Sequence, residues 1–172
     1  LSGVLDDVFG KLPGSSSKYQ LSNTRVQNSG EIVIVERDIP QSVVIFGHDG
    51  IKRDDADWYA ATILFEIIAG GFGSRLTKEI REKRGLTYGV AAYPVPLDKA
   101  GIIVGSVSTV NDRVAESIRL IRDIGRKFGE EGPTTDEMQN AKDYINGSFS
   151  LRFTNSKTIV SVLNALQRFE LG

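Results

Sequence analysis

The chain has 172 residues, of which 40% are hydrophobic and 25% charged, and its formal net charge is −1. This composition is typical of soluble globular proteins and predicts one domain, or one domain with a short appendage. The balanced charge gives no field to attract nucleic acid or an anionic membrane, and no apolar run approaches the roughly 18 residues that span a bilayer. With no cysteine and only one histidine, His48, the chain offers no disulfide, no thiolate and no site with two imidazoles.

The first thirty residues differ from the rest of the chain. Val4, Leu5 and Val8 are spaced to form one apolar face of a short helix, which Gly10 would end. Pro, Gly and Ser then dominate residues 12–17, and these residue types favour loops over regular structure. We therefore predict a helical remnant followed by a linker that reaches about residue 30.

Two runs rich in β-branched residues follow, at 31–37 and 42–47, with a turn at 38–40 between them. Apolar residues are nearly continuous in both runs, which predicts two strands that are buried on both faces or central in a sheet. Asp54 then offers an N-cap for a helix over 58–69. That helix is apolar almost all round, so we expect it to be buried.

Ser74 is placed to cap a highly charged helix that runs to Arg84 and ends at Gly85. Only Leu76 and Ile80 form an inner stripe on this helix. An exposed ion pair between Glu79 and Lys83 is expected from their i,i+4 spacing.

Two further strands are predicted at 86–95 and 100–110, joined by a turn at 97–99 into a hairpin. The alternation of apolar and polar residues over 86–95 is weak. Helical spacing of apolar residues, and a capping box at Thr134 and Glu137, predict three helices in the last part of the chain. They run from Val114 to Phe128, from Thr134 to Phe149 and from Ser156 to Phe169.

The predicted element order is therefore ββαα-ββ-ααα. Runs of strands separated by runs of helices are typical of the α+β class. We expect a largely antiparallel sheet with helices packed on one face.

A glycine-rich stretch over 70–74 precedes the charged helix. Backbone amides at a helix N-terminus are able to hold an anion. However, the stretch follows a helix rather than a strand, and no nucleotide-binding motif matches it. A tight joint between helices, with glycines at positive φ, is the simpler explanation.

Two other polar clusters have structural explanations beside functional ones. Asp54, Asp55 and Asp57 are able to bind a hard cation, but their place before a helix explains them as cap and dipole charges. His48 beside Asp49 suggests a base and its orienting carboxylate, yet adjacent strand residues point to opposite faces. A structural or surface histidine is the favoured interpretation.

Arg81 and Tyr88 form the most promising pair. Arg81 lies near the end of the charged helix, Tyr88 lies early in the next strand, and Gly85 turns the chain between them. A guanidinium fork and a phenol hydroxyl so placed are able to converge on one peptide carbonyl or developing oxyanion. The alternative is an arginine on a solvated face and a tyrosine packed on the sheet.

The segment GGFGSRLTKEIREKRGLTYGV, residues 70–90, strongly resembles the pitrilysin/insulinase family of zinc peptidases, which includes the mitochondrial processing peptidases. Residues 46–59 resemble the family segment just upstream, and Thr134 with Glu137 matches a later helix. The resemblance covers about residues 30–172.

Members of this family pair two homologous halves that close like a clamshell. One half binds zinc through an H-x-x-E-H motif and a downstream Glu, whereas the other carries an Arg and a Tyr seven residues apart. Arg81 and Tyr88 stand at that spacing and the chain has no H-x-x-E-H, so it resembles the non-metal half. The resemblance implies that Arg81 and Tyr88 contact substrate carbonyls and support the tetrahedral intermediate, and that Gly73 and Ser74 also contact substrate.

The resemblance further implies the end of a preceding domain and a linker at 1–30, then the non-metal domain at 31–172. Because the chain stops at residues 171–172 while a helix is ending, truncation of this domain at its C-terminus stays open. We expect the substrate-binding half of a zinc metalloendopeptidase for extended peptides, inactive alone, with no metal of its own. Zinc is expected in the partner half, upstream or in a separate subunit. A non-catalytic scaffold, a stand-alone peptide-binding module and a dimer stay open, and the absence of cysteine suits a bacterial periplasm or the cytoplasm.

Overall fold

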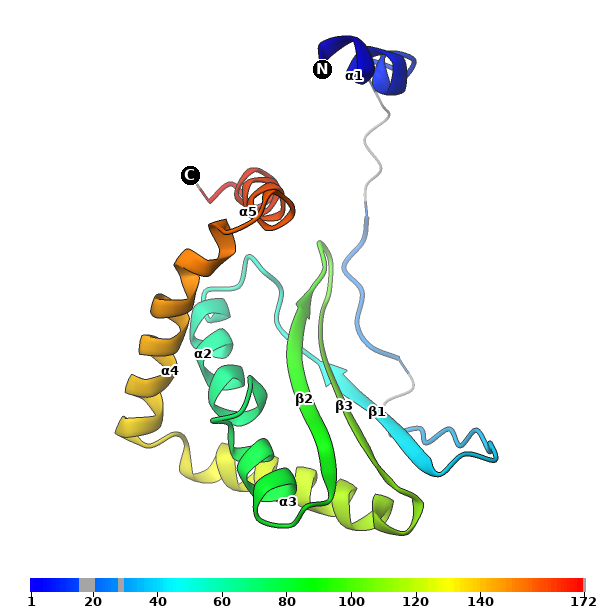
Figure 1. Ribbon diagram of the computed structural model, residues 1–172, viewed down its shortest axis with the longest axis vertical. Coiled ribbons are helices and arrows are strands. Elements are labelled where there is room, and N and C mark those ends of the chain that lie inside the picture. The colour runs from blue at the N-terminus through cyan, green and yellow to red at the C-terminus, as the bar shows by residue number, and fades with distance from the viewer. Residues whose placement is uncertain (16–20, 28–29, 172) are drawn as a thin grey trace.

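The structure, a computed structural model, describes residues 1–15, 21–27 and 30–171. Its centre is a three-stranded antiparallel sheet in the order β1-β3-β2, formed by Gln41–Asp49 (β1), Thr87–Pro96 (β2) and Gly101–Val110 (β3). β2 and β3 form the predicted hairpin, and β1 pairs with the other edge of β3. Figure 1 shows α2, α3 and α4 together on one side of the sheet. The predicted α+β class, with helices on one face of an antiparallel sheet, is confirmed.

The helical elements lie close to the predicted ranges. Their bounds are Ser2–Phe9 (α1), Trp58–Ala69 (α2), Thr77–Glu82 (η1, a π-helix), Asn111–Arg113 (η2, 3₁₀), Val114–Glu131 (α3), Thr135–Phe149 (α4), Ser150–Phe153 (η3, 3₁₀) and Ser156–Arg168 (α5). The capping box of α4 is present as predicted, since the side chains of Thr134 and Glu137 each bond the other's backbone N–H. None of the helices described is long and apolar enough to cross a membrane.

The core lies between the sheet and the helices. Ile80 is 0% exposed and Leu76 3%, so the predicted inner stripe of the charged helix is confirmed. They pack with side chains from α2, the sheet and the turn before β2, namely Ala69, Leu86, Val90, Ala92 and Val107. Half-buried residues of β1, α2 and α3 surround this cluster.

Replacing Ile80 with Val is expected to lower the free energy of unfolding by about 1 kcal/mol, because a buried methylene is lost and the tight core closes only partly around the gap. The same change at Ile39, which is 51% exposed, should alter stability by less than about 0.5 kcal/mol. Urea denaturation of both variants measures the difference. Equal losses would contradict the packing described for η1.

The predicted strand at 31–37 is wrong, so one strand rather than two precedes α2. Ile32, Val33 and Ile34 are between 74% and 80% exposed, and no ladder includes this run. A β-branched sequence fits a strand only where a neighbouring edge satisfies its backbone and side chains pack beside it. Within the part of the chain that the structure describes, residues 31–37 have no such neighbour.

The burial predicted for the strand at 42–47 and for the helix at 58–69 is also wrong. β1 is an edge strand, neither buried on both faces nor central in the sheet, and α2 is mostly half-buried. Alternate residues of β1 are half-buried and exposed, with Val43 and Ile45 on the exposed face, because helices cover the sheet from one side. In α2 only Ile67 and Ala69 are fully buried. Its N-cap is Asp57 rather than Asp54.

The glycine-rich stretch does not use positive φ, contrary to expectation: in the described chain only Gly30, Gly85 and Gly132 do so among glycines. Gly70 is instead required for a steric reason, because a side chain at this position would clash with Glu66. A Cβ there would lie 2.3 Å from the Glu66 carboxylate and 2.5 Å from the Glu66 Cα.

Candidate functional site

Arg81 is positioned by the π-helical winding of η1. The Lys83 N–H donates to the Lys78 carbonyl at 3.0 Å, five residues back, which is the wider π-type turn. Gly85 then adopts φ +60°, and the Leu86 N–H closes the helix end by donating to the Ile80 carbonyl at 2.9 Å. This left-handed turn leads directly from the Arg81 helix into β2.

Tyr88 lies in a β-bulge at the start of β2. Thr87 pairs with Thr109 and Gly89 pairs with the adjacent Ser108, so Tyr88 is an extra residue with no partner in the ladder. Its side chain is 88% exposed. Nothing packs around this ring, so its direction is set by the backbone of the bulge.

Both predicted residues line one cavity of about 720 Å³ at this end of the sheet. Its other lining residues come mainly from the turn after η1, the start of β2, the end of β3, η2 and the beginning of α3, and they include Arg84, Thr87, Ser108, Arg113 and Glu116. The two side chains are thus neither on opposite sides of the fold nor enclosed in its core.

Of the arginines that line this cavity, Arg81 is the one that forms no ion pair with any residue that the structure describes. Arg84 pairs with Glu79 at 2.6 Å, and Arg113 pairs with Glu116 at 2.9 Å. Hydrogen bonds from Lys83 and Arg84 lower the pKa of Glu79, so that carboxylate stays ionised. The Arg81 guanidinium instead lies 5.0 Å from the centre of the exposed Phe72 ring, which supports it without occupying its hydrogen-bond donors.

Gly73 and Ser74 are not among the residues that line the cavity. Ser74 is 2% exposed, and its hydroxyl donates to the Thr77 hydroxyl at 3.1 Å while accepting from the Thr77 N–H at 3.3 Å. It therefore caps the helix, as predicted from its place in the sequence. A substrate contact by either residue stays a prediction.

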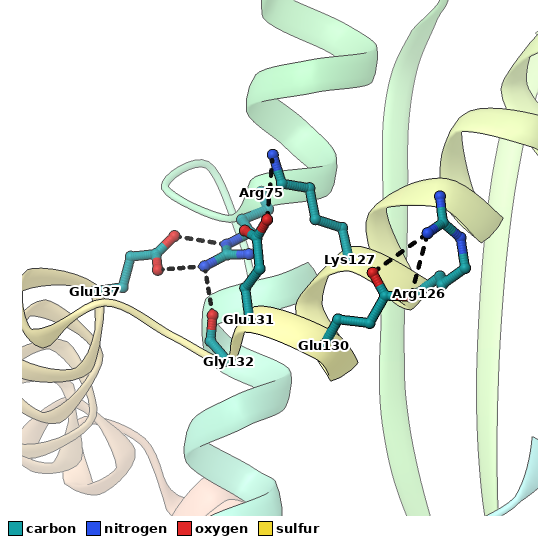
Figure 2. Close-up of polar contacts among 7 residues, drawn as sticks. All are labelled: Arg75, Arg126, Lys127, Glu130, Glu131, Gly132 and Glu137. Carbon is teal, nitrogen blue, oxygen red and sulfur yellow. Dashed lines mark hydrogen bonds and ion pairs between the residues drawn. The ribbon is translucent and has the colours of Figure 1, made fainter.

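A second polar cluster, which the sequence did not predict, fastens this helix to α4. The Arg75 guanidinium donates to both carboxylate oxygens of Glu137 at 2.7 Å and to the Gly132 carbonyl at 2.9 Å (Figure 2). It also stacks over the Phe128 ring. These bonds and that from the Thr134 N–H outweigh partial burial and lower the pKa of Glu137 to about 2. No local pattern marks the pair, because Arg75 and Glu137 are 62 residues apart.

The other polar candidates make contacts that are close in sequence or to the backbone, and Asp54 pairs with Lys52 at 3.7 Å. A ring nitrogen of His48 lies 2.5 Å from the Asp49 carbonyl oxygen, whereas the Asp49 carboxylate accepts from the Val26 N–H at 2.9 Å. The two side chains therefore do not form a base and its orienting carboxylate.

The aspartates ahead of α2 are also held locally, since the Asp55 carboxylate accepts from the Asp57 N–H at 2.9 Å. Residues 1–15, 21–27 and 30–171 contain no cluster of three His, Cys, Asp or Glu side chains suited to a metal ion.

The chain is similar in sequence to several known proteins. A curated relative, an uncharacterised zinc protease of Streptomyces coelicolor, is 29% identical over 79% of this chain and 30% of its own length. A non-peptidase homolog of Helicobacter pylori is 31% identical over 79% of this chain and 31% of its own length. The chain therefore spans about a third of the curated relatives that it matches.

A solved structure and a family model agree with these relatives. The crystal structure of a peptidase M16 inactive domain from Pseudomonas fluorescens superposes with a TM-score of 0.69 at 33% identity, covering 77% of this chain and 32% of that one. The family model for the peptidase M16 inactive domain matches residues 1–145, which include the N-terminal segment as well as the sheet. This chain belongs to the peptidase M16 inactive-domain family.

Proposed function

We propose that this chain is the substrate-binding, non-metal half of a zinc metalloendopeptidase that cleaves extended peptides. The observation that carries the proposal is the shared cavity of Arg81 and Tyr88, on a chain of the inactive-domain family. Relatives from Streptomyces and Mycobacterium that are described as zinc proteases support a proteolytic role for the complete protein.

The two side chains suit peptide carbonyls for different reasons. The Arg81 guanidinium is a planar fork of N–H donors with no acceptor, so it binds carbonyl oxygens and repels neighbouring amide N–H groups. The Tyr88 hydroxyl donates one hydrogen bond, which strengthens as negative charge develops on the oxygen of an attacked carbonyl. Arg81 would therefore mainly hold and orient the substrate, and Tyr88 would mainly stabilise the developing oxyanion.

The metal belongs to the other half in this proposal. The chain has one histidine, no cysteine and no H-x-x-E-H sequence, so its residues do not fit the zinc site of the family. Zinc in a homologous half, upstream or in another subunit, would supply the activated water. A dimer is one arrangement that would bring such a half opposite the cavity.

A non-catalytic role is the second candidate, because one relative is described as a non-peptidase homolog. The same cavity would then bind an extended peptide without cleaving it. The sequence of the partner half discriminates between the two candidates, since only a complete zinc motif there allows hydrolysis.

Arg81→Ala in the complete protein is expected to weaken binding of an unfolded peptide by roughly 10- to 100-fold, the range for hydrogen bonds from a charged donor. Fluorescence anisotropy with a labelled peptide measures this, and hydrolysis should show the loss mainly in KM. Arg126→Ala is the matched control, because Arg126 makes only exposed ion pairs on α3. Unchanged affinity in Arg81→Ala would remove this residue from substrate binding.

A further inference from the structure

We propose that Thr87 is a positioning residue for Tyr88, and that its hydroxyl holds the β-bulge which directs the phenol into the cavity. This inference rests on the proposed function, because it gives Tyr88 a task that requires accurate placement. Thr87 lies at the edge of the cavity, but its side chain is only 7% exposed, so we infer that it acts through Tyr88 rather than by direct contact with a ligand.

The bulge is necessary because buried residues lie both before and after Tyr88 in the sequence. Thr87 and Val90 are both 7% exposed and both face the core, although they are three residues apart. In a regular strand, residues an odd number apart face opposite sides. The extra residue at Tyr88 shifts this alternation by one position. Thr87, Val90 and Ala92 therefore all point inward, while Tyr88 points outward.

The Thr87 hydroxyl contacts backbone groups of Gly89 and Ser108, the pair that resumes the ladder directly after the bulge. Its Oγ1 accepts from the Gly89 N–H at 3.0 Å and lies within donating distance of the Gly89 carbonyl, at 2.8 Å, and of the Ser108 carbonyl. Across the ladder, Thr109 is 1% exposed and donates its hydroxyl to the Leu86 carbonyl at 2.5 Å. Two buried hydroxyls therefore clamp both ends of the bulge.

The clamp matters because Tyr88 has no packing of its own. A ring that is 88% exposed follows its Cα and Cβ, so a relaxation of residues 87–89 would move the hydroxyl directly. Catalytic groups lose efficiency steeply when they are misplaced by about 1 Å. Loss of the Thr87 hydroxyl should thus affect the chemical step more than substrate affinity.

The test compares Thr87→Val, which keeps the shape and loses the hydroxyl, with Thr87→Ser, which keeps the hydroxyl, in the complete protein. Thr87→Val is expected to lower kcat by about tenfold with KM changed by less than about threefold, and Thr87→Ser should recover most of the rate. Thr62→Val is the matched control, since Thr62 donates to the Trp58 carbonyl within α2, away from the cavity.

Tyr88→Phe separates this inference from the proposed function. If Thr87 acts through Tyr88, adding Thr87→Val to Tyr88→Phe should lower kcat by less than about twofold more. An equal loss in both backgrounds, or a normal rate in Thr87→Val beside a slow Tyr88→Phe, would overturn the inference and leave the proposed function intact. A normal rate in Tyr88→Phe would overturn the inference and would remove Tyr88 from the mechanism, while the substrate-binding role of Arg81 is tested separately by Arg81→Ala.

Amide hydrogen exchange in the unaltered complete protein keeps the inference testable even if Thr87→Val does not fold. The Gly89 amide is expected to exchange slowly, because the Thr87 hydroxyl accepts its hydrogen. Exchange at the rate of an unbonded amide would show that the clamp is absent and would overturn the inference.

Discussion

Replacing Tyr88 with Phe in the complete protein is expected to lower kcat by roughly 10²- to 10³-fold, the scale for removing one oxyanion donor. The substitution removes a single hydroxyl from a ring that is 88% exposed, so it should leave the fold and its stability unchanged. Because the hydrogen bond gains strength only as the carbonyl oxygen becomes charged, KM should change little. Steady-state hydrolysis of an unfolded peptide measures both constants.

Tyr144→Phe provides the matched control for this experiment. Tyr144 is also an exposed tyrosine, 60% accessible on α4, and it does not line the cavity. Its variant should hydrolyse peptide at the normal rate. Equal rates for the unaltered protein and Tyr88→Phe would remove Tyr88 from the mechanism, whereas equal losses in the two tyrosine variants would indicate an effect on folding.

Arg75→Ala is expected to lower the free energy of unfolding by about 3 kcal/mol at neutral pH, the low end of the range for breaking a buried ion pair. The low end applies because the side chains of Arg75 and Glu137 are 20% and 27% exposed. The change removes the Arg75 donor from the Glu137 carboxylate and from the Gly132 carbonyl (Figure 2), and the carboxylate keeps the bond from the Thr134 N–H. Denaturant unfolding measures the loss, and Arg126→Ala, at an exposed position, should cost less than about 1 kcal/mol.

The same ion pair predicts how stability depends on pH. The Arg75 guanidinium, together with hydrogen bonds from Thr134, lowers the pKa of Glu137 from its ordinary value of 4.5 to about 2. A carboxylate with a lowered folded-state pKa contributes fully above its unfolded value and loses that contribution as pH falls. We expect roughly 2–3 kcal/mol to be lost between about pH 4.5 and 2, after allowance for partial exposure.

Glu137→Gln isolates this titration. Glutamine is able to keep the capping box with Thr134 but carries no charge to titrate. Unfolding curves at several acidic pH values should show a flatter decline of stability in the variant than in the unaltered protein. Parallel declines would show that Glu137 does not drive the acid sensitivity.

Features with a local physical signal were predictable from the sequence. The capping box at Thr134 and the glycine stop at Gly85 were both found where expected. Each depends on a few neighbouring residues whose chemistry suffices to form it. The spacing of Arg81 and Tyr88 was visible too, but its functional meaning came from the family resemblance rather than from the spacing itself.

Features that depend on distant partners were not predictable. The bulge showed only as weak alternation over residues 86–95, because inward residues at Thr87 and Val90 break the two-residue period. The run at 31–37 had a strand's composition but no edge beside it in the described structure. The ion pair of Arg75 and Glu137 needed the packing of two helices before either side chain had a partner.

A crystal structure of the complete protein with an extended peptide bound would test the central claim most directly. We expect the Arg81 guanidinium and the Tyr88 hydroxyl to lie within about 3 Å of carbonyl oxygens of that one peptide. A peptide bound elsewhere, with either side chain turned away from its backbone, would contradict the assignment of this cavity to substrate.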